Sequence, residues 1–362
     1  MKGVLHVRST IGMYGAEKVV LNIMTAFRDL NFKSFVVTIE GANPQSQDFS
    51  NQLYGAKLPY RSIVSKKRFD LHAIYLLRSI IRDKKITIIH THDYKSLLFS
   101  CMAKLFLNIK IVHHIHGALG NTKSEKFYAW IEKLCMHRVA KIITVSTKQK
   151  NQLSEYSYFK NKVLQIDNGT VIPEKRKEKA DDDVFTIAMV ARFTPEKNHE
   201  MAIAILESLV SHKKNVRLLL LGDGPCFENI KYMVKKKNLI EFVEFVGFTS
   251  QVQEWLYRTD LLLMTSLTEG MPMCLLESMA IGLPTVSTPV GEIPKLLSES
   301  ESGTVASDIE GLTQAIIEFM DDTVLYRQCS KNARQFTADN LSVTRQAKKL
   351  SELYSEISGE TL

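Results

Sequence analysis

The stretch TEGMPMCLLESMAIGLP, residues 268–284, follows the apolar run LLLMTS, residues 261–266, which has the length and composition of a buried strand. Pro272 suits the first turn of a helix, because its missing N–H would have no partner there in any case. Gly282 suits the end of that helix. A buried strand that leads through a short loop into a helix predicts a parallel α/β domain with its ligand site at that loop.

The same alternation of strand and helix runs through the chain twice. Residues 1–172 and 185–340 each carry runs rich in Ile and Val without clean polar alternation, which is typical of a parallel sheet covered on both faces. Residues 173–184 hold a proline, a basic run and three aspartates, so we expect an exposed linker. We therefore predict two Rossmann-like, doubly wound α/β domains facing a central cleft, and a C-terminal helix at 341–362 that packs back toward the first domain. The expected strands are 4–9, 34–40, 86–92, 109–117, 140–147 and 162–169 in the first domain, and 185–193, 216–224, 243–248, 261–266 and 283–291 in the second.

Composition places the chain among ordinary globular proteins. Its 362 residues are 45% hydrophobic and 24% charged, and the length fits two domains better than one. The five cysteines are scattered without a C-x-x-C pair, which argues against a disulfide framework or a zinc site and favours a reduced compartment. The N-terminal MKGVLHVRST lacks the apolar core of a signal peptide, and no apolar run approaches the ~20 residues of a membrane-spanning helix. We expect a cytoplasmic protein.

The net charge of +8 hides an asymmetry between the two halves. Residues 1–172 hold 26 Lys and Arg against 11 Asp and Glu, a balance of +15, whereas residues 173–362 hold 21 against 28, a balance of −7. Such a split predicts an anionic partner for the first domain, such as an acidic lipid surface. The alternative is a solvated basic surface without a partner.

Two cations follow the first strand of the second domain, in the segment ARFTPEKNHE, residues 191–200. Arg192 and Lys197 flank a proline turn at the start of a helix, where the helix dipole disfavours cations. A phosphate bound by both side chains and by the helix amides would remove that conflict, and the alternative is a pair of exposed surface cations. The nearby GDG, residues 222–224, lacks the third glycine of a dinucleotide fingerprint because Phe227 stands there, so it predicts a tight turn rather than a nicotinamide site.

Two carboxylates belong to the opening stretch. If residues 269–277 were helical throughout, Glu269 and Glu277 would be about 12 Å apart, farther than the ~5–5.5 Å of a carboxylate pair that cleaves glycosides by double displacement. That separation suits the two ends of one elongated ligand, and carboxylates that accept hydroxyl hydrogens are typical of ribose and sugar recognition. The alternative is that Glu269 caps the helix and Glu277 faces solvent, which the apolar neighbours of Glu277 disfavour.

Histidines gather at the ends of two strands of the first domain. His116-Gly117 ends one of them, and a histidine followed by a glycine can contact a ligand closely. His90, His92, His113 and His114 invite a zinc hypothesis, but no set of His, Asp and Glu has recognisable metal spacing. We therefore expect no metal.

Five segments in this order and spacing resemble the retaining glycosyltransferases of family 4, of the type that builds bacterial cell-surface polysaccharide, which have the GT-B fold. They are E-x7-E (Glu269 to Glu277) with the following GLPTVSTPVGEIPKLL, R-x4-K (Arg192 to Lys197), GDGP (222–225), VGF (246–248) and HG (His116-Gly117). The resemblance covers nearly the whole chain.

The resemblance implies a role for each matching side chain. Arg192 and Lys197 would bind the donor diphosphate and stabilise the departing nucleotide, so that no divalent metal would be needed. Glu277 would hold the ribose hydroxyls. Glu269 would position the transferred sugar, and His116 would contact that sugar from the first domain.

The resemblance also assigns main-chain contacts. Four residues would line the donor site with their backbone: Gly270, Met271, Pro272 and Met273. Gly15, in the loop after the first strand, would let the backbone approach the diphosphate. The chain departs from the family pattern at Tyr14, where a second glycine is frequent, and at Glu292, which replaces the second glycine of a frequent VGG-I-P. Both changes add bulk near the expected cleft.

The expected activity is transfer of a sugar, with retained anomeric configuration, from a nucleoside-diphosphate sugar to a glycan or lipid-linked acceptor, with UDP as the commonest nucleotide. The resemblance implies a step in exopolysaccharide, capsule, O-antigen or lipopolysaccharide synthesis, and the basic first domain predicts peripheral contact with anionic membrane rather than with nucleic acid. Two alternatives stay open: a nucleotide-sugar epimerase on the same fold, which would act on the donor alone, and a non-enzymatic protein that binds anionic surfaces. The second leaves the E-x7-E spacing unexplained.

Overall fold

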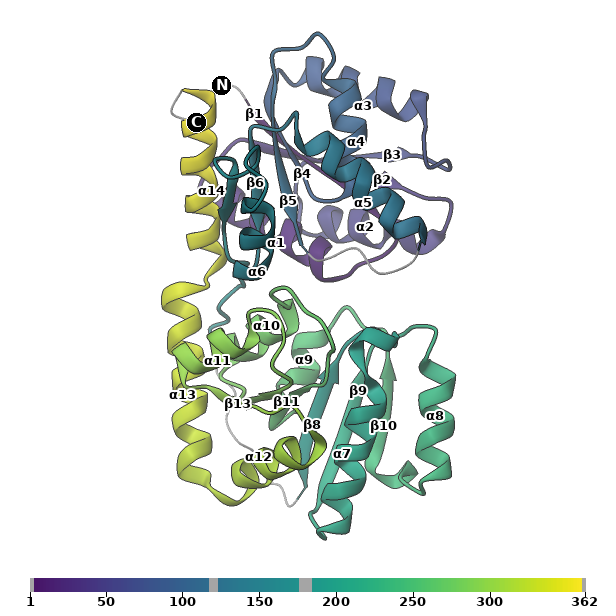
Figure 1. Ribbon diagram of the computed structural model, residues 1–362, viewed down its shortest axis with the longest axis vertical. Helices are drawn as coiled ribbons and strands as arrows, with labels where there is room; N and C mark the ends of the chain where they lie inside the picture. Colours follow the sequence, from purple (N-terminus) through teal and green to yellow (C-terminus); the bar gives the residue numbers. More distant parts are fainter. Residues whose placement is uncertain (1–2, 117–122, 176–183, 360–362) are drawn as a thin grey trace. The chain divides into compact units, whose positions relative to one another are not determined.

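The computed structural model of the chain describes residues 3–116, 123–175 and 184–359. They form two compact units: unit 1 comprises Met1–Gly169 with Val343–Leu362, and unit 2 comprises Thr170–Ser342 (Figure 1). Most of the expected linker at 173–184 lies outside the described residues, as does Gly117 of the HG motif. Each unit has its own parallel sheet and its own apolar core.

Unit 1 is built on a seven-stranded parallel sheet with the strand order β3-β2-β1-β4-β5-β6-β7. Its strands are β1 (Gly3–Thr10), β2 (Ser34–Glu40), β3 (Tyr60–Val64), β4 (Ile86–Thr91), β5 (Lys110–Ile115), β6 (Lys141–Thr144) and β7 (Val163–Gln165). Its helices are α1 (Gly15–Asp29), η1 (Pro44–Gln47), α2 (Asp48–Gly55), α3 (Leu71–Asp83), α4 (Tyr94–Ala103), α5 (Lys123–Met136), α6 (Thr147–Ser154) and α14 (Val343–Ser358). The strand order reverses between β1 and β4, which is the place where doubly wound domains bind ligands.

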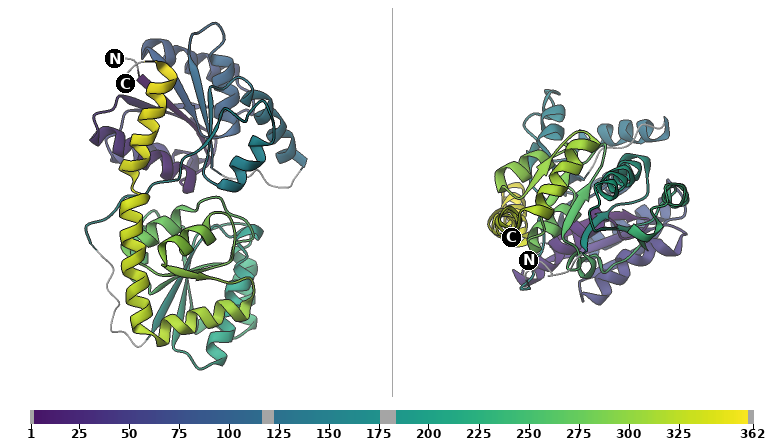
Figure 2. Two further views of the ribbon diagram at one scale, coloured as in Figure 1. Left: turned by 60° about the vertical axis from the view of Figure 1, so that its left-hand side comes forward. Right: turned by 90° about the horizontal axis from the view of Figure 1, so that it is seen from below.

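Helix α14 belongs to unit 1 although it follows unit 2 in the chain. It runs beside α1 in the views of Figures 1 and 2. Its Tyr354 is fully buried, with the hydroxyl bonded to Nδ1 of His90 on β4. Its Gln346 accepts a hydrogen bond of 3.0 Å from the amide of Gly169. The apolar face of α14 and these polar contacts hold the C-terminal helix on the N-terminal sheet.

Unit 2 has a six-stranded parallel sheet with the order β10-β9-β8-β11-β12-β13. Its strands are β8 (Phe185–Val190), β9 (Val216–Leu221), β10 (Val243–Gly247), β11 (Leu261–Met264), β12 (Thr285–Ser287) and β13 (Gly303–Val305). Its helices are η2 (Pro195–Lys197), α7 (His199–Ser211), α8 (Phe227–Lys236), η3 (Ile240–Phe242), α9 (Val252–Leu256), α10 (Met273–Ile281), α11 (Ile293–Ser300), α12 (Ile309–Asp321) and α13 (Thr323–Asn340). Here the order reverses between β8 and β11.

The predicted fold class, two Rossmann-like parallel α/β domains, is confirmed. Gly282 ends α10 with left-handed angles (φ 82°), as expected. The strand expected over 283–291 is shorter, because only Thr285–Ser287 pairs with its neighbours. Within the described ranges, no helix combines the length and apolarity that crossing a bilayer requires.

Candidate functional site

Arg192 and Lys197 lie on the loop that joins β8 to α7, and Lys197 is the last residue of the 3-10 turn η2 in that loop. Hydrogen bonds tie this loop to the one after β11: the Thr265 hydroxyl donates to the carbonyls of Asn198 (2.9 Å) and Lys197 (3.1 Å), and the Leu267 amide donates to the Glu196 carbonyl (2.8 Å). Arg192 is half exposed, and its guanidinium lies 3.4 Å from the Glu196 carboxylate. The two cations therefore stand on a fixed main chain at the carboxyl edge of the sheet.

Lys197 contacts Glu269 directly, although 72 residues separate them. Its Nζ lies 2.5 Å from Oε1 of Glu269, and the Ser266 hydroxyl donates to the same oxygen at 2.7 Å. The side chains of Lys197 and Glu269 are only 19% and 9% exposed, so water screens the pair weakly. Lys197, which was predicted to bind a phosphate, and Glu269, which was predicted to bind a sugar, thus form an ion pair with each other.

The GDG segment serves as a close-packing turn beside these cations. A Cβ on Gly222 (φ 139°) would lie 2.0 Å from the carbonyl oxygen of Ala191, and one on Gly224 (φ 155°) would lie 2.6 Å from that of Phe193. These glycines let the turn after β9 pack against the main chain on either side of Arg192. The contacts agree with a tight turn rather than with a dinucleotide fingerprint.

The N-terminus of α10 differs in detail from the sequence expectation. Pro272 is the N-cap with extended angles (φ −72°, ψ 134°), and the helix begins one residue later, at Met273. Residues 269–272 therefore precede the helix, and the separation of about 12 Å estimated for a continuous helix does not apply. Glu269 does not cap the helix but directs its carboxylate to Lys197. Pro272 has no side-chain oxygen for the first-turn amides, which leaves them able to face an anion.

Gly291 and Glu292 support the Glu269–Gly270 main chain from the loop after β12. Gly291 has φ 61°, and a Cβ there would lie 2.5 Å from the carbonyl oxygens of both Glu269 and Gly270. The Glu292 amide donates to the Gly270 carbonyl at 2.9 Å. The Glu292 side chain is only 5% exposed, so the bulk expected from this departure lies inside unit 2 rather than on its surface.

Glu277 is half buried on α10, four residues after the helix begins. Burial and the Glu269 carboxylate are the main causes that raise the pKa of the Cys274 thiol to about 12. The Lys197 ammonium lowers this pKa, and the Glu277 carboxylate raises it. Both acids of the E-x7-E spacing therefore act on one side chain in the first turn of α10. Met271 and Met273 beside it are buried.

The carboxyl edge of unit 1 carries a buried charge network that the motifs did not reveal. Arg8, at the end of β1, donates to Oε1 of Glu17 (2.8 Å) and to the backbone oxygen of His92 (2.7 Å). Glu17 is fully buried, and its other oxygen accepts from the Tyr14 amide at 3.2 Å. Gly15 is the exposed first residue of α1. Glu17 lies three residues after the N-cap Tyr14, which is the capping-box position, and this spacing is the sequence signal that could have identified it.

Five histidines line one face of the unit 1 sheet: His6, His90, His92, His114 and His116. His6 pairs with His90 across β1 and β4, and His90 pairs with Val112 on β5. Side chains alternate along a strand, so His92, two residues after His90, lies on the same face as His90. For the same reason His114 and His116, two and four residues after Val112, also lie on this face. His6 was not singled out from the sequence, because only this register brings it to the others.

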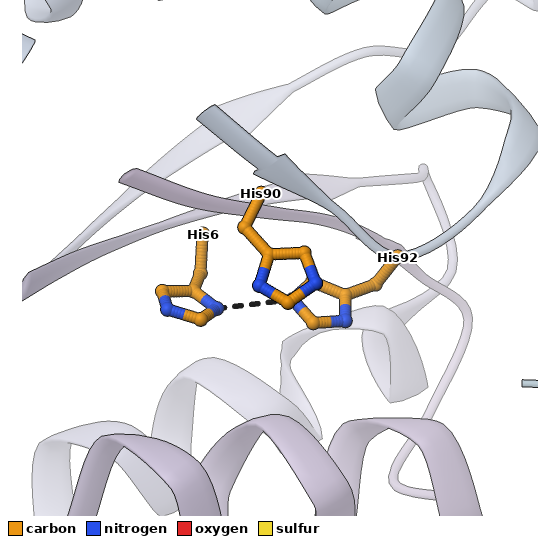
Figure 3. A group of neighbouring side chains, drawn as sticks. All are labelled: His6, His90 and His92. Carbon is orange, nitrogen blue, oxygen red and sulfur yellow. Dashed lines mark hydrogen bonds between the residues drawn. The ribbon is translucent and has the colours of Figure 1, made fainter. Parts of the chain in front are cut away.

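Two hydrogen bonds join three of these rings. Nδ1 of His6 lies 3.0 Å from Nε2 of His92 (Figure 3), and Nδ1 of His92 lies 2.9 Å from Nε2 of His116. Burial lowers the pKa of His6 and of His114 to about 3, and it lowers the pKa of His92 and His116 well below 6.5. The cluster is therefore neutral at pH 7.

Among the residues that the structure describes, two trios of histidines each bring ring nitrogens within 4.8 Å of one another: His6, His90 and His92, and His92, His114 and His116. The spacing of histidines in the sequence does not reveal these trios, because their members come from three different strands, β1, β4 and β5, and from the residues that directly follow β4 and β5. The expectation that the protein needs no metal stays a prediction.

Two family profiles together match residues 13–336. The profile described as Glycosyltransferase Family 4 matches 13–172, and the one described as Glycosyl transferases group 1 matches 171–336, so they meet where unit 1 gives way to unit 2. The chain belongs to glycosyltransferase family 4. The family expected from the E-x7-E, R-x4-K and HG segments is confirmed.

Relatives of this family 4 glycosyltransferase match over most of its length. An uncharacterized glycosyltransferase of Haemophilus influenzae is 24% identical over 331 residues, which is 90% of this chain and 92% of the relative. The UDP-Gal:alpha-D-GlcNAc-diphosphoundecaprenol alpha-1,3-galactosyltransferase of Escherichia coli is 24% identical over 312 residues, 80% of each chain. The N-acetyl-alpha-D-glucosaminyl L-malate synthase of Bacillus anthracis is 27% identical over 57% of this chain and 52% of its own.

Solved structures share the fold over almost the whole chain. HepE of Anabaena, in complex with UDP and glucose, has a TM-score of 0.86 at 17% identity, covering 98% of this chain and 100% of its own. TarM of S. aureus, in a complex that includes UDP, has a TM-score of 0.80 at 14% identity, covering 98% and 100%. The predicted GT-B architecture is thereby confirmed.

Proposed function

We propose that this glycosyltransferase moves a sugar from a UDP-sugar to an acceptor hydroxyl and retains the anomeric configuration. The observation that carries the proposal is the contact of Lys197 with Glu269 at the N-terminal side of α10. A cation, an acid and helix amides together match a diphosphate joined to a sugar. The UDP in the HepE and TarM structures supports UDP as the nucleotide.

In this proposal the ion pair changes partners when the donor binds. A diphosphate beside Lys197 competes with Glu269 for the ammonium, and the released carboxylate then accepts a hydroxyl of the transferred sugar. Arg192 adds a second cation, so the leaving diphosphate is neutralised without a divalent metal. Glu277 holds the ribose hydroxyls, and His116 contacts the sugar from unit 1.

The backbone completes the proposed donor site. The main chain of four residues lines it: Gly270, Met271, Pro272 and Met273. Gly15 at the start of α1 allows close approach of backbone to the diphosphate. We assign no covalent carboxylate nucleophile: the Glu269 carboxylate, once released from Lys197, keeps its bond to the Ser266 hydroxyl and accepts a sugar hydroxyl. The acceptor oxygen bonds to the anomeric carbon from the face on which the bond to the diphosphate breaks, and the hydroxyl proton passes to the departing diphosphate, so the configuration is retained.

We further propose a glycan or lipid-linked acceptor at the cytoplasmic face of the cell membrane, in bacterial surface polysaccharide synthesis such as exopolysaccharide, capsule, O-antigen or lipopolysaccharide. The name of the Escherichia coli relative, which specifies a diphosphoundecaprenol-linked acceptor, supports this class. So does the balance of 26 basic against 11 acidic residues in 1–172. Helix α5 adds an exposed apolar stripe: Phe127 (56% exposed), Trp130 (60%) and Leu134 (57%). Aromatic and leucine side chains on a basic surface are typical of helices that lie on anionic membranes.

A donor panel tests the enzymatic proposal. Nucleotide release is measured for UDP-, GDP-, ADP- and dTDP-sugars, with and without membrane extract and with EDTA. We expect release from one UDP-sugar, stimulation by the extract, and no effect of EDTA. A product formed from the donor alone would identify an epimerase instead, and the absence of release from every donor would overturn the proposal.

Vesicle binding tests the membrane contact separately. Replacing Phe127 and Trp130 by serine removes two anchors of the stripe. Tyr232→Ser, at an exposed aromatic of unit 2 (68% exposed), is the matched control. We expect the double variant to bind phosphatidylglycerol vesicles at least tenfold more weakly, whereas the control matches the parent protein. Equal binding of all proteins to neutral and anionic vesicles would refute the contact.

A further inference from the structure

The three rings joined in series, His6, His92 and His116, form what we call the histidine row. Each ring is neutral at pH 7, so each carries one N–H and one lone pair. In each of the two contacts, one ring must donate and the other must accept. His92 takes part in both contacts, through Nε2 toward His6 and through Nδ1 toward His116. The direction of one hydrogen bond therefore fixes the direction of the other.

Only two arrangements of the row satisfy both contacts. In the inward arrangement His116 donates to His92, His92 donates to His6, and the remaining N–H sits on Nε2 of His6. In the outward arrangement His6 donates to His92, His92 donates to His116, and the remaining N–H sits on Nδ1 of His116. Neither of these end nitrogens has a hydrogen-bond partner among the described residues, and both are buried.

The surroundings of the two ends favour the outward arrangement. The ring of His6 lies in the core, with the ring centroid of Phe27 5.8 Å away. A buried N–H without a partner is rarer in proteins than a buried acceptor without one, so the core end tolerates a lone pair better than an N–H. His116 follows β5 at the carboxyl edge of the sheet and is only partly buried as a residue, so a ligand bound at this edge can bring an oxygen that displaces the cover over Nδ1 and accepts its N–H.

We propose that His6 and His92 are positioning residues that hold His116 as a hydrogen-bond donor through Nδ1–H. The row thereby determines the kind of sugar atom that His116 can bind: an oxygen that accepts. This deepens the proposed function and rests on it only in assigning the sugar as the partner of His116. The tautomers themselves are a property of unit 1.

A metal ion in either histidine trio is the competing explanation. A bound metal lies close to the plane of each imidazole, so three ligand rings must direct their lone pairs at one point. The rings of His90 and His92 are stacked instead, with centroids 4.3 Å apart and planes 25° apart, and those of His114 and His116 are 4.2 Å apart at 25°. Stacked rings direct their lone pairs side by side, and both nitrogens of His92 already have partners.

Nitrogen NMR of the full chain, labelled with ¹⁵N-histidine, tests the row. Two-bond and three-bond couplings identify which ring nitrogen carries the proton, and single variants assign the signals. We expect Nδ1–H for His6, His92 and His116. Nε2–H on these three rings would overturn the proposal, as would about one equivalent of zinc in the purified protein together with loss of the ring N–H signals of His6, His92 and His116.

Variants separate positioning from simple structural support. His6→Asn keeps an amide N–H near the position of Nδ1, whereas His6→Leu removes the donor. We expect His6→Leu to lose the Nδ1–H of His116 and about tenfold in kcat/KM with the donor selected by the panel, and His6→Asn to retain both. Tyr354→Phe, which removes the hydroxyl bonded to His90 in the same cluster, is the matched control and leaves the His116 signal unchanged.

Each outcome decides the proposal. If His6→Leu does not fold, the tautomers of the parent protein and of His6→Asn still answer the question. An unchanged His116 signal in folded His6→Leu would contradict the row. A parent protein with the expected tautomers but no nucleotide release would overturn the proposed function and leave the row intact.

Discussion

Replacing Lys197 by methionine tests both its ion pair with Glu269 and its proposed role in stabilising the leaving diphosphate. The substitution leaves the Glu269 carboxylate, only 9% exposed, with the Ser266 hydroxyl and without its cation. Breaking a fully buried pair costs about 3–5 kcal/mol, and the 19% exposure of Lys197 lowers the expectation to about 2 kcal/mol of unfolding free energy. The loss of a cation that stabilises the leaving group costs about 10²–10³ in kcat.

The assay follows urea unfolding and nucleotide release for three variants. Trp255 is the tryptophan of unit 2, so a Trp130→Phe background makes its fluorescence report on that unit alone. Lys197→Met and Glu269→Gln each destabilise unit 2, and the double variant regains about 1 kcal/mol because no uncompensated charge remains. Activity stays low in all three. Full turnover in folded Lys197→Met, or stability losses that simply add, would refute this assignment.

Three further results follow from the same contacts. Arg192→Ala leaves the unfolding free energy within about 0.5 kcal/mol, because its ion pair is half exposed, yet lowers kcat; an unchanged kcat would remove its role. Gly291→Ala raises KM for the donor, because its Cβ would meet two carbonyls at 2.5 Å; Gly359→Ala (φ 70°), with the same backbone preference and nothing within 4 Å, is the control and leaves KM unchanged. Acid weakens unit 1: His6 and His114, with pKa about 3 in the fold, gain protons only on unfolding as pH falls below 6.5. These two histidines lower the free energy of unfolding by about 2–3 kcal/mol as the pH falls from 7 to 5.5. A urea midpoint that does not change over that range would contradict their neutrality in the folded protein.

The features that depend on one short segment could be predicted from the sequence. Uninterrupted apolar runs between amphipathic segments indicated two parallel sheets, because strands covered on both faces have no polar alternation. The loops bearing Arg192, Lys197 and Glu269 could be placed, because ligand-binding residues of such sheets follow the strands. Gly282 marked the end of α10 through its freedom to adopt left-handed angles.

The features that depend on strand register or on segments far apart in the chain could not be predicted from the sequence. The contact of Lys197 with Glu269 requires the order β8-β11, which sequence spacing does not contain. The histidine row requires His6 to pair with His90 across β1 and β4, and a shift of one residue between these strands would place the His6 ring on the face opposite to His92. The start of α10 was placed one residue early, because proline is compatible with both the N-cap and the first turn.

The anomeric configuration of the product tests the central claim most directly. The donor selected by the panel has a known configuration at its anomeric carbon, and proton NMR of the purified product gives the configuration of the new linkage from its anomeric coupling. We predict the configuration of the donor, because in the proposed mechanism the acceptor hydroxyl attacks from the face that the diphosphate leaves. An inverted linkage would contradict the account.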